Sequence, residues 1–217
     1  MRKLLLLRPE PGLSASAGRA LALGMEPLCC PLFRVEPQDW RPPDPNEYDG
    51  LLLTSANGVR HAGPQLDALQ SLPVHAVGRA TAEAAREAGF DVKSCGSGDV
   101  ADLLATLPAL RLLHLAGEDH RAVDDAGIDR RIVYRSVPIT EPGLPPIQGL
   151  VVAIHSPRAG ARLAELAHDR NKTIVAAISD AAARACGMGW EGVAVAAEPD
   201  DESLLALAAT LCQTAIK

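Results

Sequence analysis

The stretch that decides the fold is Leu51-Leu52-Leu53-Thr54-Ser55, because it returns later in the chain as Val152-Ala153-Ile154-His155-Ser156. The match extends from residues 51–105 to residues 152–206 at a constant offset of 101. In both copies an apolar run is followed by a small or polar turn and then by a helix rich in alanine and leucine. A repeat of this length indicates a duplicated domain, because solenoid repeats have shorter periods.

The rest of the chain repeats out of order. Residues 4–10, followed by a helix to Gly24, resemble residues 111–118, followed by a short helix to Gly127. If this unit completes both sheets, one domain is continuous and the other is split. We therefore predict a discontinuous domain A at residues 1–32 and 139–217. Domain B, at residues 39–131, is inserted into it. A linker of two paired strands, at residues 33–38 and 132–138, joins the two domains.

Composition agrees with such an architecture. The chain is 47% apolar and 22% charged, and it contains only two Phe, two Trp and two Tyr. The cores must therefore be built from Leu, Val and Ala, the usual filling of parallel sheets covered on both faces. Alternating strands and helices predict an α/β fold of two flavodoxin-like or Rossmann-like domains with parallel sheets.

Charge and cysteine content restrict the compartment and the partners. A formal charge of −6 argues against bulk attraction to nucleic acid. The apolar run at residues 4–7 is too short for a signal peptide or a membrane span. Five cysteines without a C-x-x-C pair predict reduced thiols and a cytoplasmic protein. Cys29 and Cys30 are expected to be buried in a strand.

The loops that follow the strands are the candidate ligand site, because open α/β sheets bind ligands at the carboxyl ends of their strands. These loops are rich in Ser, Thr, Asn and Gly, and helix N-termini attract anions whatever the net charge. For any one of these residues taken alone, capping of a helix is a sufficient explanation without a ligand. Six such loops on two hinged domains favour a ligand cleft, at residues 8–10, 54–58, 78–81, 117–121, 155–160 and 179–181.

Other chemistries have weaker support. Residues 96–101 fit G-x-G-x-x-A, with Glu118 downstream, but they do not open the first βα unit of their domain. Ser156 is not in a G-x-S-x-G elbow, which argues against a hydrolase. No zinc spacing is met by the four residues that could be drawn as a metal cluster, His114, Asp119, His120 and Asp124.

Seven short pieces of the chain, taken in order and spacing, resemble one family. They are Leu7-Arg8-Pro9, residues 54–59, Val77-Gly78 with Thr81-Ala82, Gly117 with Arg121, Val133-Tyr134, His155-Ser156-Pro157 and Ala177-Ile178-Ser179. The chain resembles the uroporphyrinogen-III synthase family over essentially its whole length.

The resemblance implies a cofactor-free cyclisation of hydroxymethylbilane, a linear tetrapyrrole with eight carboxylates, into uroporphyrinogen III. Loss of the terminal hydroxyl as water gives an azafulvene, which the substituted carbon of ring D attacks. A spiro intermediate forms and fragments, and closure follows with ring D inverted. The resemblance also implies a monomer without metal, nucleic-acid or membrane partners, with possible transient contact to the enzyme that supplies hydroxymethylbilane.

The resemblance assigns roles to particular residues. Tyr134 is the catalytic candidate, because a phenol keeps its proton at neutral pH and can donate a hydrogen bond to the departing hydroxyl. It is expected outside both repeats, on the hinge. Arg8 and Arg121 are the expected charged contacts to the substrate. The full set of substrate-binding candidates is Arg8, Thr54, Ser55, Asn57, Gly78, Thr81, Gly117, Arg121, Ser156 and Ser179.

This chain departs from the family at two of its turns. It has Asp180-Ala181-Ala182 where many members have Thr-Thr or Lys-Thr, and Asn57 where some have Arg. Two other functions stay open from the residues alone. One is a hinged cytosolic binding protein or sensor for an anionic metabolite, and the other is a sugar-phosphate isomerase with Glu118 or His155 as its base.

Overall fold

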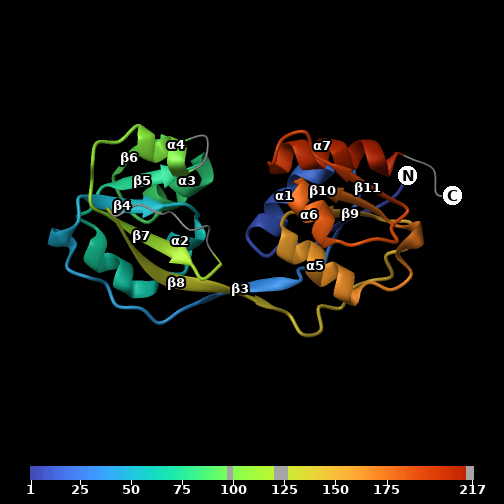
Figure 1. The fold of residues 1–217 in the computed structure, drawn as a ribbon, viewed down its shortest axis with the longest axis horizontal. Helices are drawn as coiled ribbons and strands as arrows, with labels where there is room; N and C mark the ends of the chain where they lie inside the picture. The colour runs from blue at the N-terminus through green and yellow to red at the C-terminus, as the bar shows by residue number, and fades with distance from the viewer. Residues whose placement is uncertain (97–99, 120–126, 214–217) are drawn as a thin grey trace. The chain divides into compact units, whose positions relative to one another are not determined.

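The computed structural model describes residues 1–96, 100–119 and 127–213 of the chain. It divides into two compact units, and each is described by itself. Unit 1 consists of Met1–Arg34 and Val137–Lys217, and unit 2 of Val35–Ser136. Both boundaries lie inside the segments 33–38 and 132–138, where the sequence predicts that the chain crosses between domains. Figure 1 traces the chain through both units.

Unit 1 is a parallel five-stranded sheet in the order β11-β10-β9-β1-β2. The strands are β1 (Leu4–Leu6), β2 (Pro27–Cys29), β9 (Val151–Ile154), β10 (Ile174–Ala177) and β11 (Gly192–Val195). The helices are α1 (Gly12–Ala22), α5 (Pro157–Leu166), α6 (Asp180–Ala185) and α7 (Asp201–Cys212), with a short 3-10 helix at Arg170–Lys172.

Alternate residues of these strands enter two different cores. Leu5 faces a cluster that includes Leu163 of α5, whereas Leu4 and Leu6 face a cluster that includes Leu204 of α7. Successive side chains of a strand point to opposite faces, so the fully apolar strands require helices on both sides of the sheet. This is the covered parallel sheet that the low aromatic content predicts.

Unit 2 has a six-stranded sheet in the order β3-β8-β7-β4-β5-β6. The strands are β3 (Phe33–Pro37), β4 (Gly50–Leu53), β5 (Val74–Val77), β6 (Val92–Gly96), β7 (Leu112–Gly117) and β8 (Ile128–Pro138). The helices are α2 (Asn57–Arg60), α3 (Arg79–Glu87) and α4 (Val100–Ala105), with 3-10 helices at Pro45–Glu47 and Gly63–Leu69.

The repeat is visible in the topology. β4 and β9, α3 and α6, and α4 and α7 begin 101 residues apart. β1 lies beside β9 in unit 1 as β7 lies beside β4 in unit 2, which confirms the out-of-order resemblance of residues 4–10 to residues 111–118. The α/β fold with parallel sheets is therefore confirmed.

β3 and β8 are neighbours in the sheet, and backbone hydrogen bonds join the chain at both ends of their pairing. The Gln38 N–H donates to the Val133 carbonyl over 2.9 Å, and the Ile139 N–H donates to the Leu32 carbonyl over 2.9 Å. β8 is one unbroken strand that also pairs with β7. β8 therefore contains the whole of the second crossing segment, residues 132–138.

The expectation that both adjacent cysteines are buried is wrong for one of them. Cys30 is buried and its thiol donates to the Pro142 carbonyl over 3.3 Å, but Cys29 is exposed. Cys29 ends β2, an edge strand, and neighbouring strand residues point to opposite faces.

Among the residues that the structure describes, no helix is long and apolar enough to cross a membrane.

Candidate active site

In each sheet, one pair of neighbouring strands is followed by connections that run toward opposite edges of the sheet. In unit 2 this pair is β7 and β4, and in unit 1 it is β1 and β9. Ligands of doubly wound sheets bind at such a pair, beyond the carboxyl ends of the strands. The predicted site residues therefore form two sets, one at the strand ends of each unit.

Tyr134 reaches the unit 2 set through an irregularity in the sheet. The β7–β8 pairing is one to one up to Ala116 with Ile132, and the next pair is Gly117 with Tyr134. Val133 is therefore an extra residue, as in a β-bulge. Val133 is buried in the unit 2 core, and Tyr134 packs against the same core cluster. In a regular strand these neighbours would point to opposite faces, so the bulge redirects the tyrosine.

Gly117 provides the space that the Tyr134 ring occupies. A Cβ atom at Gly117 would lie 2.5 Å from the Cε2 and Cζ atoms and 2.8 Å from the hydroxyl oxygen of Tyr134. The backbone is also joined there, because the Glu118 N–H donates to the Tyr134 carbonyl over 2.9 Å. The phenol thus lies directly over the carboxyl end of β7. Tyr134 lies in unit 2, two residues before the unit ends at Ser136, and outside both copies of the repeat.

The two tyrosines have different surroundings. The Tyr48 hydroxyl donates to Asp129 over 2.9 Å, whereas the Tyr134 hydroxyl has no hydrogen-bond partner among residues 1–96, 100–119 and 127–213. The ring of His61 lies 6.1 Å from that of Tyr134, centroid to centroid. Burial, together with the nearby Arg60, lowers the pKa of His61 and favours a neutral imidazole. Sequence reasoning missed His61, whose only signal is its place directly after α2.

Thr54, Ser55 and Asn57 follow β4, the strand beside β7. The Thr54 hydroxyl lies 3.0 Å from Nε2 of His114, which is buried in β7. The Ser55 hydroxyl accepts a hydrogen bond from the Asn57 N–H over 3.2 Å and so shapes the start of α2. A serine hydroxyl that accepts such a bond can still donate its own proton to a ligand.

The loop after β5 carries Gly78 and Thr81. Gly78 has φ +83°, a left-handed conformation that favours glycine, and no atom lies within 4 Å of the place where its Cβ would be. Thr81, in the first turn of α3, is only 5% exposed.

Arg121 lies outside the described residues. So do His120 and Asp124, two of the four residues that the sequence analysis considers as a metal cluster. Among those that are described, no three His, Cys, Asp or Glu side chains form a group that could hold a metal ion.

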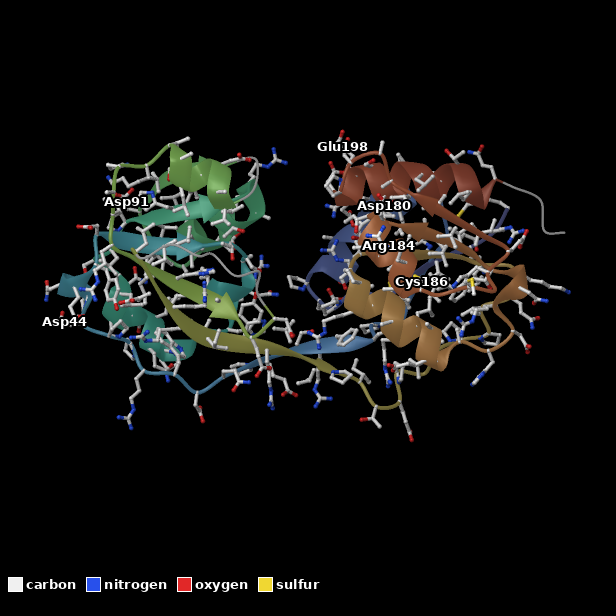
Figure 2. The ribbon with its side chains drawn as sticks, in the orientation of Figure 1. Asp44, Asp91, Asp180, Arg184, Cys186 and Glu198 are labelled. Atoms are coloured by element: carbon white, nitrogen blue, oxygen red, sulfur yellow. The ribbon has the colours of Figure 1, made fainter. Side chains whose placement is uncertain are left out.

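In unit 1, Ser156 and Ser179 each cap a helix. Ser156 Oγ accepts from the Ala159 N–H over 3.2 Å, and Ser179 Oγ accepts from the Ala182 N–H over 3.3 Å. Asp180, labelled in Figure 2, follows in the first turn of α6, where a carboxylate suits the helix dipole. Ser55 and Ser156, which the repeat aligns, therefore both stabilise the start of a helix.

Arg8 lies at the end of β1 in a network centred on Asp201 of α7. Oδ1 of Asp201 accepts three hydrogen bonds, from Arg8 Nη1 over 2.9 Å, Ser16 Oγ over 2.6 Å and His155 Nε2 over 2.7 Å. Oδ2 accepts from Arg19 Nε over 2.8 Å. Arg8 Nη1 also donates to Ser16 over 3.0 Å. The network joins the ends of β1 and β9 to α1 and α7.

Burial and hydrogen bonding act in opposite directions on these groups. Burial disfavours the charged form of Asp201, but the bonds from His155, Ser16 and Arg19 outweigh it and lower the pKa of this carboxyl. Burial lowers the pKa of His155, although the bond to Asp201 opposes the shift. The carboxylate can only accept, so the neutral imidazole carries its proton on Nε2. The cluster is thus an ionised carboxylate, a neutral histidine and two guanidinium groups.

Sequence reasoning placed Arg8 but missed Asp201, Arg19 and Ser16. An acidic residue in the first turn of a helix is common, because it interacts favourably with the helix dipole, and so it does not by itself indicate a functional site. The available signal was the repeat, which aligns Asp201 with the apolar Val100.

Comparison with known proteins identifies the family. The sequence profile described as uroporphyrinogen-III synthase HemD matches residues 14–206. The chain belongs to the uroporphyrinogen-III synthase family. Membership makes it a lyase of heme biosynthesis that cyclises hydroxymethylbilane to uroporphyrinogen III, which confirms the predicted activity. It also decides against the binding-protein and isomerase alternatives. A search of curated proteins found no match.

Solved structures of the family share the fold at low sequence identity. The uroporphyrinogen-III synthetase from Helicobacter pylori is 17% identical, with a TM-score of 0.68 over 97% of this chain and 100% of that chain. A mutant uroporphyrinogen III synthase from the extremely thermophilic bacterium Thermus thermophilus is 19% identical, with a TM-score of 0.52 over 98% of this chain and 100% of that chain. These similarities support the two-domain α/β fold of the family.

Proposed function

We propose that Tyr134 assists the loss of the terminal hydroxyl of hydroxymethylbilane, the step that opens the cyclisation. A hydroxyl is a poor leaving group, and a hydrogen-bond donor stabilises it as it departs. The pyrrole N–H gives up the proton that completes the water, which leaves the neutral azafulvene. The observation that carries the proposal is the position of the phenol, which lies over Gly117 at the carboxyl end of β7 with no described partner for its hydroxyl. A ligand group at this strand end can therefore accept the Tyr134 O–H.

The later steps require positioning more than further acid or base chemistry. The substituted carbon of ring D attacks the azafulvene, the spiro intermediate fragments, and ring D recloses inverted. Without the enzyme the same chain closes without inversion, so the protein must hold the conformer in which ring D can attack. Binding energy from the eight carboxylates of the substrate can supply this selection.

The remaining predicted residues are proposed to bind those carboxylates. The Ser156 and Ser179 hydroxyls cap helices through an oxygen lone pair, so each O–H stays available to a carboxylate. Glycine at the start of α3 leaves the backbone open to a ligand. The proposed binding set is Arg8, Thr54, Ser55, Asn57, Gly78, Thr81, Gly117, Arg121, Ser156 and Ser179.

We also propose a monomeric cytoplasmic enzyme that meets the protein supplying hydroxymethylbilane only transiently. The absence of a C-x-x-C pair among five cysteines supports a reducing compartment. An unstable substrate supports brief contact with its source.

The test supplies fresh hydroxymethylbilane to the purified protein and separates the oxidised porphyrin isomers. We expect type III from the wild type. Tyr134→Phe should lower kcat roughly tenfold, the worth of one lost hydrogen bond, with KM nearly unchanged and a larger fraction of type I.

Tyr48→Phe is the matched control, because it removes the other phenol hydroxyl of the chain, which donates to Asp129. It should leave turnover intact. Type I alone from the wild type would refute the activity, and unchanged turnover in Tyr134→Phe would remove the role of this residue.

A further inference from the structure

The Asp201 network carries more positive charge than its carboxylate can balance. Arg8 and Arg19 share one carboxylate, and the buried His155 adds no charge while it is neutral. The cluster therefore has a net charge of about one positive unit, from two guanidinium groups against one carboxylate. A second carboxylate can balance it.

Both guanidinium groups keep donors that the network does not use. Arg8 bonds through Nη1 only, and its Nε and Nη2 have no partner among the residues that the structure describes. Arg19 bonds Asp201 through Nε and Nη2. The Arg8 and Arg19 side chains are 29% and 50% exposed, so a dissolved anion can reach them.

Gly12, the first residue of α1, allows Arg8 to take its position. A Cβ at Gly12 would lie 2.5 Å from Arg8 Nε and 2.7 Å from Nη2. The guanidinium thus lies against the start of the helix while Asp201 holds its other edge. A guanidinium held in this way loses less conformational freedom when it binds an anion.

The location agrees with a binding role. Arg8 follows β1 and His155 follows β9, so the cluster lies where the connections of the unit 1 sheet leave in opposite directions. Ligands of this fold class bind at that point. Guanidinium groups with free N–H donors are suited to carboxylates, which they can bind through two parallel hydrogen bonds.

We infer that Arg8 and Arg19 form a carboxylate-binding subsite in unit 1, with Asp201 as the positioning residue that holds both guanidinium groups. The inference rests on the proposed function, in which the substrate is a polycarboxylate, and it assigns one substrate carboxylate to this subsite. A clamp that only stabilises unit 1 would use the same contacts but would not affect substrate affinity.

The experiment measures kcat and KM for hydroxymethylbilane in Arg8→Gln, Arg19→Gln and Asp201→Asn, well below their unfolding temperatures. Each arginine variant should raise KM about tenfold, the effect of one lost charge-assisted hydrogen bond, with kcat within about twofold. A smaller folded fraction would lower the apparent kcat and leave KM unchanged. KM therefore separates binding from stability.

The positioning role of Asp201 has its own readout. Asp201→Asn should raise KM about as much as either arginine change, because both guanidinium groups lose their common anchor. In the background of Arg8→Gln with Arg19→Gln, the same change should leave KM within about twofold. A KM effect of equal size in both backgrounds would overturn the positioning role.

Arg184→Gln is the charge-matched control in the same unit. Arg184 lies in the last turn of α6, and its side chain is exposed and labelled in Figure 2. It should leave KM unchanged. Wild-type KM in both Arg8→Gln and Arg19→Gln would overturn the subsite, whereas formation of type I alone by the wild type would instead refute the proposed function.

Discussion

Asp201 shows how one residue can combine a structural and a functional role. Its carboxylate is mostly buried, receives donors from Arg8, Ser16, Arg19 and His155, and has a lowered pKa because those bonds outweigh burial. A carboxyl whose pKa is lower in the folded state than its ordinary value of 3.8 stabilises the protein above that pH. The stabilisation is lost as pH falls below about 4.

We therefore predict that Asp201→Asn lowers the free energy of unfolding by about 2 kcal/mol at pH 6 to 7, where the carboxylate is charged. The difference from the wild type should shrink as pH falls from about 5 to 2, because the wild-type carboxyl then takes up its proton. Denaturant unfolding of both proteins at several pH values measures this difference in the free energy of unfolding. A difference that stays constant with pH would show that the network does not depend on the charge of Asp201.

At the scale of elements, the bulge in β8 decides where Tyr134, the proposed hydrogen-bond donor, lies. Val133 and Tyr134 both meet the core cluster on one face, and the ring of Tyr134 covers Gly117. We predict that Gly117→Ala lowers kcat about as much as Tyr134→Phe, roughly tenfold, because a methyl group would displace the ring. Steady-state kinetics with fresh hydroxymethylbilane measures the change.

A double-mutant cycle separates displacement of the ring from general damage to the strand. Once Tyr134→Ala has removed the ring, Gly117→Ala should lower kcat little further, because nothing remains to displace. Equal effects of Gly117→Ala with and without the tyrosine would instead indicate a role of Gly117 that is independent of Tyr134.

At the scale of the whole molecule, one unit is built from both ends of the chain. β1 is hydrogen-bonded between β2 and β9, so residues 4–6 share a core with residues 151–154. Gly160 is a sensitive point of this unit, because a Cβ there would lie 2.8 Å from the Ala182 carbonyl oxygen and 3.0 Å from Cys186 Sγ.

We predict that Gly160→Ala lowers the stability of unit 1 by about 1–3 kcal/mol through overpacking of α5 against α6. In hydrogen exchange of the full chain, protection should fall in β1 as well as β9 and remain in β4 and β7, whose cores are separate. Gly18→Ala, in α1 with no atom within 4 Å of its Cβ, is the control and should not lower protection. Equal loss in both units would show one cooperative core.

Several features of the fold and the site could be predicted from the sequence because they depend on local pattern. The repeat of Leu51-Leu52-Leu53 as Val152-Ala153-Ile154 marks two strands that the structure shows at the expected offset. Ser55 and Ser156 lie in the turns after these strands, and each accepts a hydrogen bond from a backbone N–H in the first turn of the following helix. Cys29 was misjudged, because sequence does not show that β2 lies at an edge.

The sequence by itself therefore determined the strand and helix alternation, the duplication with its displaced unit, and the loops that carry the candidate site, since each is encoded in neighbouring residues or fixed spacings. Only the tertiary structure decided which face Tyr134 takes, because that depends on a one-residue shift in the pairing of β7 with β8. Only the tertiary structure shows that Asp201 binds Arg8, because the two residues are 193 positions apart in the chain. Register and long-range ion pairs arise from contacts between distant segments, which no local pattern contains.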